Sequence, residues 1–92
     1  PQDRMADAMG EIDEAQRKLY ELDQRRRREQ ETIRELCARC TDLDDQERYV
    51  ILKRYLYREK WDDIGYWMEL GDRRLFRIHR SACDKLEAFL GP

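Results

Sequence analysis

Proline is absent from the interior of this chain, since the only two prolines are Pro1 and Pro92. Four glycines are therefore the main residues able to interrupt a helix. Charged residues make up 43% of the chain, against about 25% in an average globular domain. Together these features predict an all-α fold of long solvated helices around a thin core. Ninety-two residues suit one compact domain, or a small domain with an extension.

Residues 2–38 are predicted to form one uninterrupted helix about 55 Å long. Two sets of positions spaced seven apart hold ten apolar residues out of twelve, and Arg26 and Glu29 are the exceptions. The spacing is that of a coiled-coil seam. The first set is Met5, Ile12, Leu19, Arg26, Ile33 and Cys40, and the second is Ala8, Ala15, Leu22, Glu29, Leu36 and Leu43. We expect residues 1–40 to be an oligomerisation element, most simply for a dimer, unless the stripe folds back on the rest of the chain.

The strongest run of charge is Arg25–Arg28. Its simplest interpretation is a solvated helix face, because acidic residues lie at helical pairing distance on both sides. A second phosphate contact or a docking site for an acidic partner is the functional alternative. The sequence leaves the role of this run open.

A second helix is expected to begin at Asp44, where Glu47 stands three residues later and completes a capping box. This helix ends near Arg58. The residues predicted for its core face are Tyr49, Ile51, Leu52, Tyr55 and Leu56. Trp61 and Trp67 are predicted core anchors of the next helix, with Trp67 nearer the rim.

Residues 60–86 have the spacing of two helices joined by a tight turn, which is typical of a helix-turn-helix motif. With Gly65 as the small residue at the crossing, the offsets −1, +3, +5, +10 and +13 fall on Ile64, Met68, Leu70, Leu75 and Ile78. Glu69 occupies the place where the turn normally carries glycine. A left-handed conformation there costs about 1–2 kcal/mol, unless Gly71 absorbs the bend. Residues 43–92 are thus predicted to form a helix-turn-helix domain.

The last helix is predicted to carry basic residues on the face opposite its apolar stripe. The stripe is Leu75, Ile78, Ala82, Leu86 and Phe89. Such a helix is suited to the major groove of double-stranded DNA. A net charge of −2 argues against a nonspecific polycation, so binding has to rest on a local patch. The predicted DNA-binding residues are Arg73, Arg74, Arg77, Arg80, Ser81, Lys85 and Tyr66.

Three cysteines and one histidine have spacings that would allow a zinc site in principle, and they are Cys37, Cys40, Cys83 and His79. Packing is the favoured interpretation, because Cys40 continues the apolar seam and no glycine or proline forms a knuckle near Cys37. Whether these four residues meet is left open. A single histidine without a glycine-rich loop does not indicate catalysis. We expect no enzymatic activity, metal or cofactor.

Three segments carry a resemblance to known regulators, namely LDDQERYVILKRYL (residues 43–56), WDDIGYWMEL (61–70) and RRLFRIHRSACDKL (73–86). They resemble region four of bacterial sigma factors and, more closely, the small phage and prophage transcriptional regulators of the RinA/ArpU type. The resemblance covers about half the chain. It implies DNA binding, control of late or lysis-related phage genes, and a reading or phosphate-contacting role for Arg73, Arg77 and Arg80. Glu69 departs from the general motif.

These patterns lead us to expect a sequence-specific DNA-binding regulator that dimerises through its N-terminal helix. An adaptor that docks on RNA polymerase or another partner is the first alternative, and a DNA-packaging subunit of a phage is the second. No stretch approaches the roughly 20 apolar residues of a membrane span. No secretory leader pattern is visible. We therefore expect a cytoplasmic protein with no membrane partner.

Overall fold

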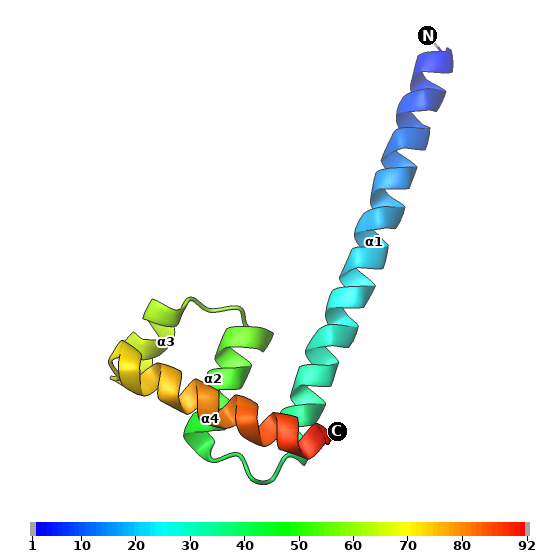
Figure 1. Cartoon of the computed structure of the whole chain (residues 1–92). Helices are drawn as coiled ribbons and strands as arrows, with labels where there is room; N and C mark the ends of the chain where they lie inside the picture. The colour runs from blue at the N-terminus through cyan, green and yellow to red at the C-terminus, as the bar shows by residue number, and fades with distance from the viewer. Residues whose placement is uncertain (1, 92) are drawn as a thin grey trace.

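The computed structural model describes the backbone of residues 2–91 and the side chains of residues 13–91, and this part of the chain contains helices and no strand. The elements in chain order are α1 (Gln2–Arg39), α2 (Asp45–Ile51), η1 (Leu52–Leu56), α3 (Trp61–Met68) and α4 (Asp72–Leu90) (Figure 1). The prediction of an all-α chain with a long N-terminal helix is confirmed. Within residues 2–91, no helix has both the length and the apolar character required to span a membrane.

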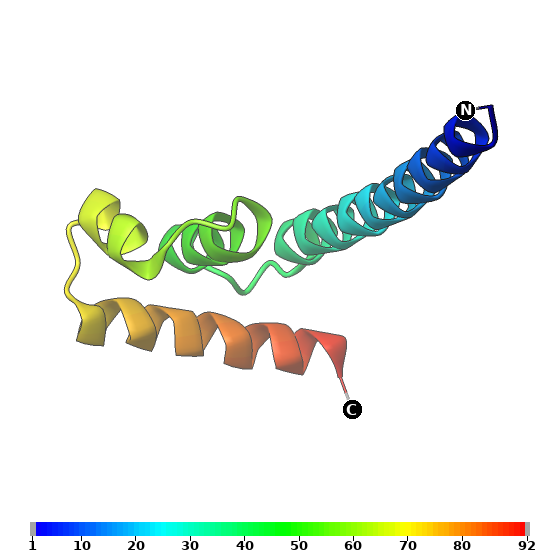
Figure 2. The same ribbon diagram turned by 90° about the horizontal axis from the view of Figure 1, so that it is seen from above.

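The helix α1 extends well beyond the other helices (Figures 1 and 2). Its C-terminal end lies beside α2 and α4, while its N-terminal half points away from them. Leu19 and Leu22, which belong to the predicted seam, are 66% and 59% exposed. The side chains of Met5, Ala8 and Ile12 lie outside the described residues. The part of the seam that is described is therefore covered at its C-terminal end and uncovered in its middle.

The arginine run on α1 has the surroundings expected of a solvated face. Arg25 Nε lies 3.3 Å from Glu29 Oε1, and Arg27 Nε lies 3.2 Å from Asp23 Oδ2. All four arginines of the run are exposed. Ion pairs of this kind at the surface contribute little to stability, at about 0–1 kcal/mol each.

Two small clusters of buried side chains form the core. The first joins the end of α1 to α2 and α4 and consists of Cys37, Cys40, Leu43, Ile51 and Ala82. The second joins α2, α3 and α4 and consists of Val50, Ile64 and Leu75. Ile64 and Leu75 are two of the apolar residues at helix-turn-helix spacing, and both are buried here. The first cluster shows that the C-terminal end of α1 shares a core with the helices that follow it.

Arg48 of α2 fastens the end of α1 to the following helices. Its Nε donates to the carbonyl oxygen of Cys37 at 2.9 Å, and its Nη2 lies 3.4 Å from the carbonyl oxygens of both Cys40 and Leu43. The last carbonyl groups of a helix have no partner within the helix. One guanidinium thus satisfies the end of α1 and the loop that follows, and it ties both to α2.

The start of α2 has the predicted capping box. Asp44 Oδ1 accepts from the Glu47 amide at 2.7 Å, and Glu47 Oε1 accepts from the Asp44 amide at 3.0 Å. At its other end α2 continues into η1, a π-helical turn in which the Tyr57 amide donates to the Leu52 carbonyl at 3.0 Å. A π-turn accommodates one residue more than an α-turn and shifts the register of the side chains that follow.

The predicted core face of this helix is partly wrong. Tyr49 and Tyr55 are exposed, whereas Val50 is fully buried and was not predicted. Glu47 occupies a buried position on α2, and the π-turn changes the register of the side chains that follow Ile51. Ile51 and Leu56 are buried as expected.

The turn between α3 and α4 takes its bend at Glu69, which has φ 57° and ψ 42°. Gly71 has φ −75° and does not absorb the bend. The Leu70 amide donates to the Gly65 carbonyl at 2.9 Å, which closes the end of α3. A Cβ on Gly65 would lie 3.1 Å from the Leu70 carbonyl oxygen, which is a tight contact, so the crossing favours glycine there.

Replacing Glu69 with glycine should raise the free energy of unfolding by about 1 kcal/mol, because glycine adopts the left-handed conformation without the cost borne by other residues. Urea denaturation measures the effect. The matched control is Glu69→Gln, which removes the charge and keeps the Cβ, and it should change stability by less than about 0.5 kcal/mol. Equal effects of the two substitutions would assign the gain to charge rather than to the backbone.

Candidate nucleic-acid interface

The helix α4 has one buried face and one basic face. Leu75 and Ala82 are fully buried, and Ile78 and Leu86 are half-buried against the two core clusters. The four arginines predicted to bind DNA are all exposed, and they are Arg73, Arg74, Arg77 and Arg80. Within the described residues, none of the four forms an ion pair with a carboxylate. Their guanidinium groups are therefore available to an external anion.

Aromatic packing holds the first turns of α4 against the start of α3. The ring of Trp61 meets Phe76 at 5.2 Å and His79 at 4.9 Å between centroids, both edge to face. Arg54 of η1 lies over the same indole at 4.7 Å. Trp61 is thus the anchor that the sequence predicted, and it lies between η1 and α4.

A buried carboxylate on α2 engages two of the other predicted DNA-binding residues. Ser81 Oγ donates to Glu47 Oε2 at 2.7 Å, and Lys85 Nζ donates to Glu47 Oε1 at 2.6 Å. Glu47 is only 2% exposed. Burial acts to raise the pKa of Glu47, but hydrogen bonds from Lys85, Ser81 and the Asp44 amide outweigh it and lower that pKa to about 2.

Ser81 and Lys85 were expected to face DNA or the phosphate flank, and the structure gives both an intramolecular role instead. Their position one helical turn apart puts them on the same side of α4, where both reach Glu47. The sequence contains part of this arrangement, because Glu47 belongs to a capping box and Ser81 and Lys85 are four residues apart. The partner itself is 34 and 38 residues away in the chain, beyond any local pattern.

Tyr66 and Trp67 lie together on the outer side of α3. They are 76% and 70% exposed, and their rings meet edge to face at 5.5 Å. The prediction that Trp67 is a core anchor is wrong. The buried side of α3 is formed by Ile64 and Gly65, and successive residues of a helix turn away from that side.

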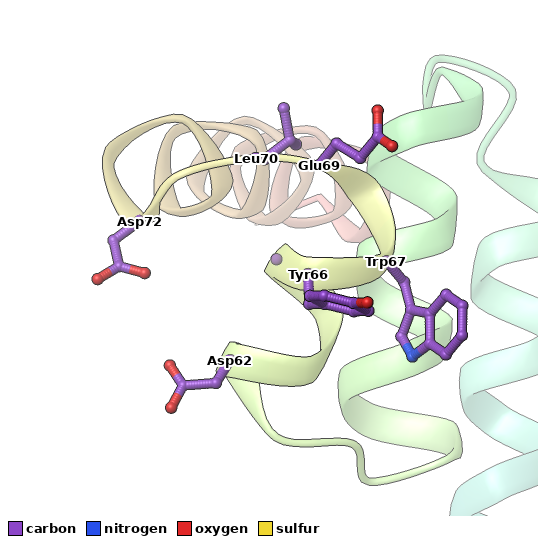
Figure 3. A pocket seen from close by; sticks show the side chains of 7 residues that line it. Asp62, Tyr66, Trp67, Glu69, Leu70 and Asp72 are labelled. Atoms are coloured by element: carbon purple, nitrogen blue, oxygen red, sulfur yellow. The ribbon is translucent and has the colours of Figure 1, made fainter.

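These two aromatic residues border a pocket at the turn (Figure 3). Its lining is Asp62, Gly65, Tyr66, Trp67, Glu69, Leu70 and Asp72. Figure 3 shows the carboxylates of Asp62 and Asp72 on the same side of the pocket. Tyr66 is exposed as predicted, but the acidic lining repels phosphate and makes a DNA contact at Tyr66 unfavourable.

The cysteines and the histidine are only partly brought together. Cys37 and Cys40 are buried in the core, whereas His79 Nε2 lies 2.7 Å from Tyr55 Oη and 3.4 Å from Cys83 Sγ. Burial and then Arg54 lower the pKa of His79. Burial, Asp84 and Glu87 raise the pKa of the Cys83 thiol. Among the side chains described, no three of His, Cys, Asp or Glu are grouped so as to hold a metal ion.

Comparison of the chain with protein-family models, with curated proteins and with solved structures found no match. The functional assignment therefore has to rest on the chemistry of the surface. The feature with the most definite chemistry is the set of four exposed arginines on α4.

Proposed function

We propose that this chain is a sequence-specific, non-enzymatic DNA-binding transcriptional regulator in which α4 enters the major groove. The observation that supports it is a helix buried along one face with four exposed arginines in its first three turns, none of them paired with a carboxylate among the side chains of residues 13–91. The sequence resemblance to sigma region four and to RinA/ArpU-type regulators of phages and prophages agrees with this proposal. The helix α1 would join two copies and set the distance between their binding sites.

Each arginine has a role that its place on α4 favours. Arg73, Arg77 and Arg80 follow one another at helical spacing, so they form one row along the helix. A guanidinium donates two parallel hydrogen bonds to guanine O6 and N7, and a row of three can contact neighbouring base pairs. Arg74 lies to one side of the row and would contact a phosphate. Ser81, Lys85 and Tyr66 are not part of the proposed interface, for the reasons given above.

Replacing Arg77 with alanine should weaken binding to a selected DNA site by about 1–3 kcal/mol and relax the base preference at one position. Selection from a random duplex pool identifies the site, and gel-shift titration at several salt concentrations measures binding. Arg77→Lys keeps the charge and loses the paired donors, so it should lose base preference and keep most of the salt dependence. The matched control is Arg17→Ala, an exposed arginine on α1, which should leave binding unchanged.

An equal loss on selected and random duplexes would reduce Arg77 to a phosphate contact. No retardation of any duplex, even in dilute buffer, would contradict DNA binding altogether.

The exposed pair of Tyr66 and Trp67 favours a second candidate function, an adaptor that docks on a protein such as RNA polymerase. Exposed aromatic residues are enriched where proteins bind one another. The three carboxylates beside the pair would select a basic partner surface. Trp67→Ala should abolish such docking and leave DNA retardation intact, which separates the two functions.

A further inference from the structure

The apolar stripe of α1, which is the predicted coiled-coil seam, is interrupted by two charged residues. On one side of the division Leu19 and Leu22 are exposed, and among the described residues they belong to neither core cluster. On the other side Ile33 and Leu36 are half-buried. Between them lie Arg26 and Glu29, both exposed and both at positions of the stripe. Between residues 19 and 36 the stripe thus consists of an apolar pair, a charged pair and a second apolar pair.

The second apolar pair borders a groove between α1, α2 and α4. Its lining is Ile33, Leu36, Cys37, Ile51, Tyr55, Cys83 and Leu86, and its volume is about 200 Å³. The side chains that line it are aliphatic, aromatic or thiol-bearing, and none carries a charge. A groove of this composition is suited to aliphatic side chains, and a second copy of the chain offers Leu19 and Leu22.

We propose that two copies associate through α1 as an antiparallel pair. The two-fold axis would cross α1 halfway between Arg26 and Glu29. In a two-fold interface, if one residue contacts a second, then the second contacts the first. Arg26 then lies opposite the partner's Glu29, Leu22 opposite the partner's Ile33, and Leu19 opposite the partner's Leu36. Between residues 19 and 36, each apolar position of the stripe then meets an apolar one. Leu19 and Leu22 of each copy enter the apolar groove of the other.

Charge decides against the parallel arrangement. A parallel two-fold pair would place Arg26 against the partner's Arg26 and Glu29 against the partner's Glu29. Like charges brought together in an interface cost several kcal/mol. The antiparallel pair turns both contacts into attractions. In the single chain Glu29 forms an exposed ion pair with Arg25 at 3.3 Å. Such a pair contributes little to stability, so replacing it with a contact to the partner's Arg26 costs little free energy.

The inference rests on the self-association included in the proposed function, and adds its direction and register. Counting along the helix from the axis, the two Arg39 residues would lie about 35 Å apart. That distance is close to the repeat of about 34–36 Å between major-groove sites on one face of DNA.

Charge reversal tests the direction. Arg26→Glu and Glu29→Arg should each raise the dimer dissociation constant at least about tenfold, because each brings like charges together at both symmetric contacts. The double variant restores opposite charges and should return the dissociation constant to within about threefold of the original. Light scattering and sedimentation of the full chain give these values. The matched control is Arg27→Glu, one residue away and off the stripe, which should leave dimerisation unchanged.

Spin labels test the register independently. Arg17→Cys and Gln24→Cys, each in a Cys83→Ser background, place labels seven residues apart on α1 at positions outside the stripe. In the antiparallel pair the distance between labels at position 17 should exceed that at position 24 by about 15 Å. Equal distances, a monomer at all concentrations, a larger ring, or no recovery in the double variant would overturn the proposal.

None of these measurements involves DNA, so the two proposals fail separately. An antiparallel dimer that never retards a duplex would reject the proposed function alone. A monomer or parallel dimer that binds a selected site would reject only this inference.

Discussion

Replacing Glu47 with glutamine should lower the free energy of unfolding by about 2–3 kcal/mol, because hydrogen bonds to a buried ionised group are the strong ones. The carboxylate of Glu47 accepts from Lys85 at 2.6 Å, from Ser81 at 2.7 Å and from the Asp44 amide at 3.0 Å. Glutamine has one acceptor oxygen in place of two, and its amide group would face the Lys85 ammonium. Urea denaturation at pH 7 measures the loss. Glu31→Gln, at an exposed position on α1, is the matched control and should be nearly neutral.

The same substitution should change how stability depends on pH. In the folded chain the pKa of Glu47 is lowered from 4.5 to about 2. The stabilisation is therefore complete above the unfolded pKa, and it is lost as the pH falls from about 4.5 towards 2. The original chain should lose stability in this interval more steeply than the Glu47→Gln variant. Parallel curves for the two proteins between pH 5 and 2.5 would contradict the assigned role of the carboxylate.

Replacing Leu75 with alanine should cost about 3–4 kcal/mol, within the range for removing a buried leucine side chain. Leu75 is fully buried with Val50 and Ile64, and one of its methyl groups lies 3.5 Å from where a Cβ on Gly65 would be. The same face of α4 holds the arginine row in place, so DNA retardation should decline together with the folded fraction. Circular dichroism and denaturant titration measure the effect.

Leu90→Ala provides the comparison for Leu75, since Leu90 lies on the same helix and is 64% exposed. It should change the free energy of unfolding by less than about 0.5 kcal/mol. A loss below about 1 kcal/mol at Leu75 would mean that α4 is not held by the second core cluster.

Local patterns in the sequence predicted much of the fold, for identifiable reasons. The long helix and the capping box at Asp44 and Glu47 each depend on residues within one or two turns of one another. The sequence left the bend after α3 open between Glu69 and Gly71, and the structure places it at Glu69. The exposure of the arginines on α4 followed from the apolar stripe on its opposite face. In each case the physical cause lies within a short stretch of chain.

The errors have a common cause in long-range packing. Periodicity shows that a helix has an apolar face, but not which part of that face a neighbour covers. Trp67 was therefore assigned to the core, although α3 is short and buries only one narrow side. Ser81 and Lys85 were predicted to contact DNA, and their hydrogen bonds to Glu47 were not foreseen because Glu47 belongs to another helix. The π-turn at η1 has no local signal that we recognise in the sequence.

If the chain is the DNA-binding dimer proposed above, the bonds from Arg48 to the end of α1 have a consequence for the choice of operator. Because one guanidinium contacts three carbonyl oxygens, α1 and the helices that follow it have little freedom to rotate relative to each other. In such a dimer the distance between the two α4 helices would be fixed, and no hinge would allow it to adjust to a different spacing of half-sites. Inserting about five base pairs between half-sites would turn one of them to the far side of the duplex. The regulator would then measure the phase of its operators as well as their bases.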